Sequence, residues 1–156
     1  MSETRAQGSS VPWRQIRPLP ARALALAAWV FSRQKDGEHK FAHSWRVMRQ
    51  VREPMVRAAA ALHDVVESGG CTLEDLRAAG FPDRVVHWVD LLSKRPGEEY
   101  LAYIRRLAIS KPARVIKLAD LADNLVHKGR TDPDRRARYM IAMAWLRNRR
   151  PRKLPA

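Results

Sequence analysis

The chain has 156 residues, 30 lysines and arginines against 16 aspartates and glutamates, and a hydrophobic content of 46%. This length is enough for one domain with a real core. The single cysteine, Cys71, excludes an intramolecular disulfide framework and a cysteine-rich zinc site. No apolar run approaches the roughly 20 residues of a membrane span, and the first residues lack the apolar core of a signal peptide. We therefore expect a cytoplasmic protein with no membrane partner.

The net charge of +14 is concentrated in the second half of the chain. Residues 79–156 contain 18 basic and 8 acidic residues, whereas residues 1–78 contain 12 and 8. Such a field attracts polyanions, including nucleic acid and nucleotides. The alternative is that arginine serves here only as a solubilising residue, so the charge by itself assigns no function.

Hydrophobic spacing and turn residues predict about eight helices and no strand. Residues 1–20 are polar and contain several serines and prolines, which indicates a flexible tail. Helices are expected over residues 21–34, 39–52, 54–67, 72–80, 82–92, 98–109, 112–128 and 133–147, followed by a basic tail over residues 148–156. The sequence therefore predicts an all-α, single-domain helical bundle over residues 21–147.

Two side-chain patterns refine these helices. Thr72 and Asp75 match a capping box at the start of the short fourth helix. Helical spacing in the second helix places Trp45 among the residues expected to face the core, together with Val47 and Val51.

The polar pair His63 and Asp64 interrupts an apolar run, A-A-L-H-D-V-V-E-S over residues 60–68. Burial of an unpaired imidazole or carboxylate costs several kcal/mol, about 2 to 7 each, and a metal ion removes that cost. His43 and Asp120 are polar groups inside other apolar helix faces. Two imidazoles and two carboxylates suit a hard or borderline divalent ion such as Mn²⁺, with Mg²⁺, Fe²⁺, Co²⁺ or Zn²⁺ as alternatives.

Each of these residues also has a purely structural interpretation. His43 and His63 could donate to backbone carbonyls, and Asp120 could pair with Lys117 or an arginine. Glu67 follows His63 by four residues, so on a helix it projects from the same face and is a candidate for proton transfer. Its alternative is a solvated carboxylate at a helix end.

The order of His43, His63-Asp64 and Asp120 resembles the H…HD…D signature of the HD phosphohydrolase superfamily, whose members are helical metal-dependent phosphoesterases. Three longer strings, A-L-H-D-V-V-E, T-L-E-D-L and V-I-K-L-A-D-L-A-D-N, resemble the hydrolase domain of Rel/SpoT-type alarmone enzymes and their small stand-alone relatives. The resemblance covers about residues 21–145. It implies Mn²⁺-dependent removal of the 3′-pyrophosphate of ppGpp to give GDP, with the four residues as metal ligands and Glu67 orienting a water or handling its proton.

The sequence departs from the family at several positions. The family string H-D-V-V-E-D has lost its second acid, which is Ser68 here. The family string R-K-S-G-E-P-Y-I-x-H corresponds to Q-K-D-G-E-H-K-F-A-H, in which Gln34 replaces the arginine and Lys35 is retained. The family string D-R-L-H-N reads D-L-A-D-N, which keeps the asparagine as Asn124. By resemblance, Lys35 and Asn124 are the candidate substrate-binding residues, although Lys35 could equally be a helix C-terminal cation.

Three functions are therefore compatible with the sequence. The first is hydrolysis of ppGpp, and the second is hydrolysis of another nucleotide or nucleotide cofactor, which the altered positions permit. The third is a non-catalytic nucleotide- or nucleic-acid-binding HD protein that uses its basic half; the complete set of four ligands argues against it. A small nucleotide is thus the expected partner, nucleic acid is a less favoured one, and the sequence does not indicate an oligomeric state.

Overall fold

A computed structural model describes residues 12–128 and 130–148 of the chain. Within these residues it contains helices and no strand, as predicted for an all-α bundle. The elements in chain order are the 3₁₀ turn η1 (Pro12–Gln15) and the helices α1 (Leu19–Phe31), α2 (Gly37–Arg49), α3 (Pro54–Leu62), α4 (Leu73–Ala78), α5 (Asp83–Leu92), α6 (Tyr100–Leu107), α7 (Lys111–His127) and α8 (Pro133–Arg147).

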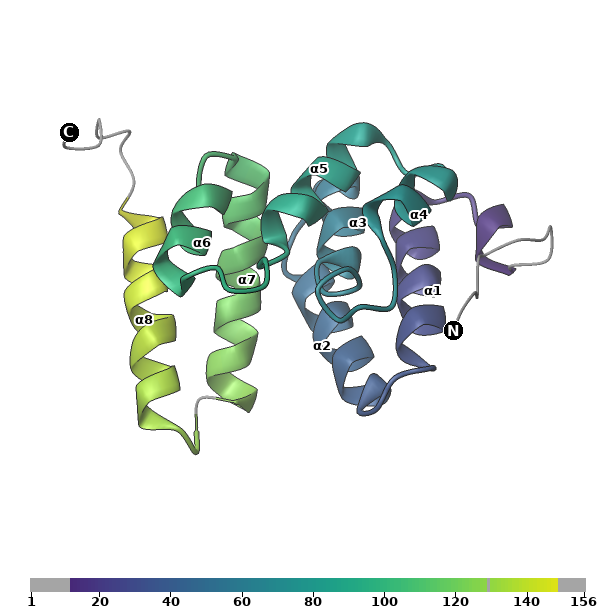
Figure 1. Cartoon of the computed structure of the whole chain (residues 1–156). Helices are drawn as coiled ribbons and strands as arrows, with labels where there is room; N and C mark the ends of the chain where they lie inside the picture. Colours follow the sequence, from purple (N-terminus) through teal and green to yellow (C-terminus); the bar gives the residue numbers. More distant parts are fainter. Residues whose placement is uncertain (1–11, 129, 149–156) are drawn as a thin grey trace.

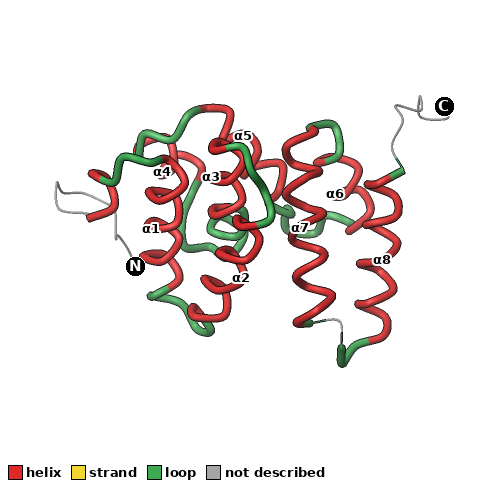
Figure 2. Tube along the Cα trace, turned by 180° about the vertical axis from the view of Figure 1, so that it is seen from behind, coloured by secondary structure: helices red, strands yellow, loops and turns green. Residues whose placement is uncertain are grey.

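The helices form two adjoining groups, α1–α5 and α6–α8 (Figure 1). Helix α7 joins them because it packs against α2, α3 and α5 on one side and against α8 on the other. The view from behind shows the same division, with short loops between the helices (Figure 2). In the described part of the chain, no helix combines the length and apolar character needed to cross a bilayer.

Helix α3 is the centre of the larger group, in contact with α1, α2, α5 and α7. Its last five residues, Ala58 to Leu62, are completely buried. A helix that is apolar on all sides is stable only when it is covered on all sides, and the four alanines in this run allow the neighbouring helices to approach closely. The next residue, His63, is consequently held deep in the protein, with 2% of its surface exposed.

Side-chain caps fix the start of several helices. Thr72 and Asp75 form the predicted capping box of α4. Ser110 caps α7 by accepting from Ala113 N, and Asp132 caps α8 by accepting from Arg135 N. These bonds satisfy backbone N–H groups that have no partner inside their own helix.

The prediction that the third helix continues to Glu67 is wrong. Helix α3 ends at Leu62, and residues 63–69 form successive turns. Val65 N donates to Leu62 O at 3.1 Å and Gly69 N donates to Val66 O at 3.0 Å, which are i→i+3 bonds, whereas Ser68 N donates to Asp64 O at 3.0 Å, an i→i+4 bond. The hydrogen bonds therefore do not continue the regular i→i+4 pattern of α3. The apolar pattern of this segment does not distinguish a tight series of turns from a helix, because Val65 is buried in either conformation.

Two further predictions differ from the structure. The packed part begins before residue 21, because η1 buries Trp13 against the core. Trp45 does not face the core: it is 41% exposed, on the opposite side of α2 from Val47, and the guanidinium of Arg49 lies 6.0 Å from its ring centroid. Residues 1–11 and 149–156 of the predicted tails lie outside the described residues.

Candidate metal centre

Three buried side chains from three segments converge on one point. His43 lies in α2, His63 caps the C-terminal end of α3, and Asp120 lies in α7. One donor atom from each lies within 4.8 Å of the others. The Nε2 atoms of the two histidines are 3.2 Å apart, and His43 Nε2 is 2.9 Å from Asp120 Oδ1.

These separations match the edges of a coordination polyhedron. Two ligands that each lie about 2.0–2.2 Å from one ion, at angles near 90–110°, are about 3 Å apart. Asp64 adds a fourth donor at the edge of the cluster, since its Oδ2 lies 3.4 Å from His63 Nε2 and 3.7 Å from His43 Nε2. Its side chain is 32% exposed, so this side of the cluster is open to solvent.

The outer nitrogens of both rings already have partners. His43 Nδ1 lies 2.7 Å from Asp123 Oδ2, and His63 Nδ1 lies 2.7 Å from the carbonyl oxygen of Ala60. Because both partners accept hydrogen bonds, each neutral ring carries its proton on Nδ1 and keeps a lone pair on Nε2. The two lone pairs then face each other beside carboxylate oxygens, an arrangement that is repulsive unless a proton or a metal ion lies between them. The donor set therefore fits a divalent metal ion.

Asp120 is oriented by two neighbours on its own helix. Lys117 Nζ donates to Asp120 Oδ2 at 2.7 Å, and Asn124 Nδ2 donates to Asp120 Oδ1 at 2.7 Å. Lys117 is itself buried and lies 5.1 Å from the ring centroid of Tyr103. The ion pair and the metal-type cluster therefore coexist, because each uses a different oxygen of Asp120.

A second buried carboxylate, Asp123, connects α2 to α7. Its Oδ2 contacts His43 Nδ1, and Arg46 donates to both of its oxygens, from Nε at 2.6 Å and from Nη2 at 2.9 Å. Burial alone raises the pKa of the Asp123 carboxyl, but the hydrogen bonds from Arg46 and His43 outweigh this effect and lower it. Asp123 is therefore ionised at neutral pH.

The cluster strongly favours positive charge. Desolvation alone lowers the pKa of His63, but the charge of Asp64 and the hydrogen bond and charge of Asp120 outweigh it and raise the pKa to about 9. Desolvation raises the pKa of Asp120, yet the charge of Lys117 and the bonds from the two histidines hold it well below its usual value. An environment that retains a proton on a buried imidazole also attracts a metal cation.

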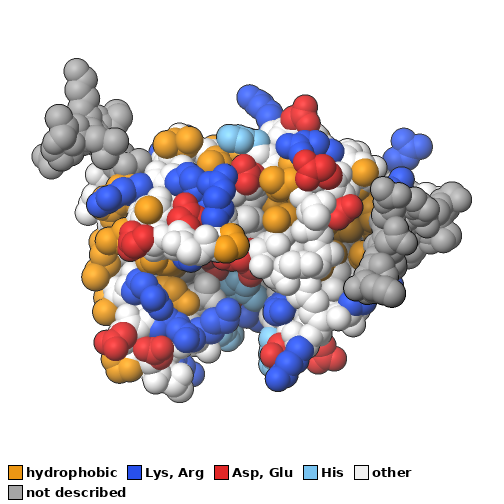
Figure 3. All heavy atoms as spheres, in the orientation of Figure 1, with side chains coloured by type: hydrophobic (Ala, Val, Ile, Leu, Met, Phe, Trp, Pro, Cys, Tyr) orange, Lys and Arg blue, Asp and Glu red, His pale blue; other side chains and the backbone are white. Residues whose placement is uncertain are grey.

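The cluster lies beside a cleft of about 540 Å³ that its own His43 and Asp64 help to line. We call the buried residues His43, His63, Lys117, Asp120 and Asp123 the floor. Of these, His43 and Asp123 line the cleft, and the other three lie behind them in the cluster. The exposed or half-buried residues His39, Lys40, His127 and Lys128, which line the same cleft, are called the rim. In Figure 3, histidine side chains are visible in a hollow between the two groups of helices, with lysine and arginine side chains beside it.

The structure brings five of the seven predicted site residues together and leaves Glu67 and Lys35 outside the cluster. His43, His63, Asp64 and Asp120 meet at one point, and Asn124 lies next to Asp120.

Glu67 is not on a continuation of α3 but in the turns that follow it, exposed to solvent. The surrounding protein and the charge of Asp64 nevertheless raise the pKa of its carboxyl group. Lys35 is exposed in the loop between α1 and α2, whereas Lys40 and Lys128 line the cleft.

Sequence reasoning missed Asp123 and Arg46. The helical spacing contained a signal for both, because Asp123 lies three residues after Asp120 and Arg46 three residues after His43, so each shares a face with a candidate ligand. The sequence could not show that these two faces oppose each other across α2 and α7.

In comparisons with known proteins, no family model matches the chain and no curated protein sequence matches it. The geometry of the cluster therefore carries the functional argument.

Proposed function

We propose that the chain is a divalent-metal-dependent phosphohydrolase of the HD type. Its preferred substrate in this proposal is ppGpp, from which it removes the 3′-pyrophosphate to give GDP, with Mn²⁺ as the preferred ion. The observation that carries the proposal is the convergence of His43, His63 and Asp120 within 4.8 Å, from segments far apart in the sequence and in the order of the HD signature. Asp64 completes the ligand set at the solvent side.

The bound ion would supply a water of lowered pKa and would offset charge on a phosphate oxygen. The protein residues hold and orient the other groups. Glu67 is the base in this proposal: its carboxylate accepts the proton of the attacking water, for which a raised pKa is an advantage near neutral pH. In this proposal the exposed side chain of Glu67, in the turns after α3, faces the attacking water once substrate is bound.

The cleft offers complementary contacts for an anionic nucleotide. Lys40 and Lys128 provide positive charge at the rim. Asn124 uses its amide nitrogen on Asp120, and its Oδ1 atom is buried without a hydrogen-bond partner among the described residues. A hydroxyl of a bound sugar would satisfy that oxygen, which supports Asn124 as a substrate-binding residue. Lys35 would have to reach the cleft from its exposed loop.

A second candidate is hydrolysis of a different phosphorylated nucleotide. The observation that favours it is the bond between two positions that depart from the alarmone-hydrolase strings: Gln34 Nε2 donates to Ser68 Oγ at 3.1 Å. Lys40, a third departure, donates to Gln34 Oε1 at 3.0 Å. A neutral pair thus occupies positions at which the family strings have an arginine and an acid, so the charge on this side of the metal cluster is altered.

The proposal is tested by incubating metal-stripped protein with ppGpp, with and without Mn²⁺, while GDP and pyrophosphate are measured. We expect Mn²⁺-dependent release that falls at least about 10²-fold in Asp64→Ala, because one ligand and its charge are lost. Asp90→Ala is the matched control, since Asp90 is a half-buried aspartate of α5 that pairs with Arg95.

Each outcome has a definite meaning. Equal turnover by Asp64→Ala and by the unsubstituted protein contradicts the metal mechanism. Binding of Mn²⁺ without release of pyrophosphate from ppGpp rules out this substrate and leaves the second candidate, which a panel of phosphorylated nucleotides then tests.

A further inference from the structure

The buried carboxylate of Asp123 has no part in the ligand set, yet it accepts several short hydrogen bonds. Its two oxygens receive three hydrogen bonds of 2.6–2.9 Å, two from Arg46 and one from His43. Its exposed surface is 6%. Burial of a carboxylate costs free energy unless the group is paired and hydrogen-bonded. Asp123 meets this condition through the candidate ligand His43 and through Arg46, so these contacts link it to the candidate metal site.

The geometry points to Asp123, held by Arg46, as a positioning residue that fixes the ring of His43 and directs its Nε2 at the metal. This inference rests on the metal site of the proposed function. A carboxylate at Nδ1 selects the tautomer whose Nε2 is free for the ion, holds the ring plane and increases the basicity of the ligand nitrogen. His63 has a backbone carbonyl in the same place, which orients its ring without adding a charge.

Arg46 has a specific part in this arrangement. It contacts Asp123 with Nε and Nη2, one on each oxygen, and such a paired contact fixes the plane of a carboxylate as well as its position. Arg46 and His43 lie three residues apart on α2, so a single helix face presents both to Asp123. The contacts of Asp123 with Arg46 and His43 therefore fix both the packing register of α2 against α7 and the orientation of the His43 ring.

The alternative is that Asp123 and Arg46 only connect α2 to α7. In that case their loss would lower the stability of the fold but would leave the metal affinity of the folded protein unchanged. Metal affinity and the state of the His43 ring consequently separate the two interpretations, whereas stability alone does not.

The experiment is a calorimetric titration of metal-stripped full-length protein with Mn²⁺. For Asp123→Asn we expect Kd to rise about 10- to 100-fold, the usual effect of removing an outer partner of a ligating histidine. Arg46→Gln should raise Kd by less, because the carboxylate remains but is held less firmly.

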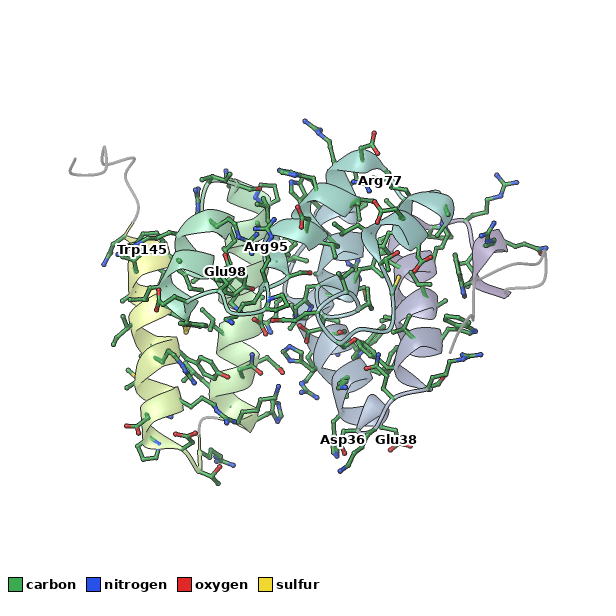
Figure 4. All side chains as sticks on the ribbon, viewed as in Figure 1. Asp36, Glu38, Arg77, Arg95, Glu98 and Trp145 are labelled. Atoms are coloured by element: carbon green, nitrogen blue, oxygen red, sulfur yellow. The ribbon has the colours of Figure 1, made fainter. Side chains whose placement is uncertain are left out.

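The matched control is Asp36→Asn, which removes the same charge from the same cleft. Asp36 lies at the start of α2 and is exposed (Figure 4). Its backbone is left-handed, with φ of 58°, a conformation that asparagine also tolerates. We expect its Kd for Mn²⁺ to stay within about twofold of the unsubstituted protein, because surface charges are largely screened.

A second measurement reads the His43 ring directly. In the zinc-loaded, ¹⁵N-labelled protein, NMR should show a slowly exchanging Nδ1 proton on His43, retained in Asp36→Asn and lost or rapidly exchanging in Asp123→Asn. If Asp123→Asn does not fold, Arg46→Gln provides the same two readouts at a half-buried position.

The outcomes distinguish this inference from the proposed function. Unchanged Mn²⁺ affinity and an unchanged Nδ1 proton in the folded variants would overturn the positioning role. Absence of divalent-metal binding by the unsubstituted protein would instead overturn the metal site itself.

Discussion

The floor and the rim differ in how their charged side chains are compensated. The floor residues are buried and contact one another at 2.7–3.7 Å, so each charge is compensated inside the protein. The rim residues are half-buried or exposed, and solvent screens them. The floor therefore has one fixed geometry that suits an ion. In the proposed function, the rim side chains adapt to the shape of the larger anionic substrate.

The largest expected effect is at the floor. Lys117→Met removes the buried ammonium that pairs with Asp120 and leaves this buried carboxylate with His43, His63 and Asn124 as its remaining partners. The loss should lower the free energy of unfolding of the metal-stripped protein by about 3–5 kcal/mol. Urea denaturation measures this change. Lys35→Met, at an exposed lysine, should change it by less than about 0.5 kcal/mol. Similar losses of unfolding free energy in Lys117→Met and Lys35→Met would contradict the claim that the buried lysine contributes more to stability than the exposed one.

An intermediate effect on the free energy of unfolding is expected for two ion pairs outside the cleft, one largely buried and one exposed. Arg106 Nε lies 2.7 Å from Glu98 Oε1, with side chains 20% and 15% exposed, whereas Arg77 Nη1 lies 2.9 Å from Glu74 Oε1, with side chains 51% and 81% exposed. In Figure 4, Glu98 is labelled near α6 and Arg77 near α4. Near pH 7, Glu98→Gln should cost about 1–3 kcal/mol and Glu74→Gln less than about 1 kcal/mol.

The pH dependence gives the sign of the Glu98 contribution. The hydrogen bond from Arg106 lowers the pKa of Glu98 to about 2 from its ordinary value of 4.5. Its stabilisation is therefore complete above about pH 4.5 and disappears as the pH falls toward 2. The stability difference between Glu98→Gln and the unsubstituted protein should shrink over that interval. A difference that stays constant down to pH 2.5 would contradict this assignment.

The smallest effect is expected at a neutral contact outside the cleft, the hydrogen bond from Gln34 to Ser68. A double-mutant cycle with Gln34→Ala and Ser68→Ala should give a coupling energy of about 0.5–1.5 kcal/mol, because the bond is neutral and partly buried. Denaturant unfolding provides the four stabilities. The cycle between Gln34→Ala and Ser32→Ala is the control, since Ser32 donates to Trp29 O instead. Equal coupling in both cycles would show that the bond to Ser68 contributes nothing specific.

Much of the fold could be predicted from local signals. The capping residues Thr72 and Asp75 marked a helix start that the structure confirms. The end of α3 could not be predicted, because a buried apolar segment has the same composition in a helix and in tight turns. The exposure of Trp45 was not predicted, because large aromatic side chains usually lie in the core. Its position two residues before Val47 places it on the opposite side of the helix, and this signal was given too little weight.

The candidate site was predictable only in part. Polar residues within apolar faces identified His43, His63 and Asp120. The ion pair of Asp120 with Lys117 is confirmed, and because the other oxygen of Asp120 faces the histidines, the role as a metal ligand stays a prediction that this pair does not exclude. Asp123 could not be found in this way. In the string L-A-D-N it resembles an ordinary polar position, and only the packing of α2 on α7 buries it.

The origin of the cluster in three separate segments has a thermodynamic consequence. In the proposed mode of binding, an ion is held by residues that come together only when α2, the end of α3 and α7 are assembled, so it binds the native chain and not the unfolded one. Such a ligand adds RT ln(1 + [M]/Kd) to the free energy of unfolding, about 2.7 kcal/mol when its free concentration is 100 times Kd. The amount of native protein in a cell would then follow the supply of the ion, and metal depletion would lower the abundance of the protein as well as its activity.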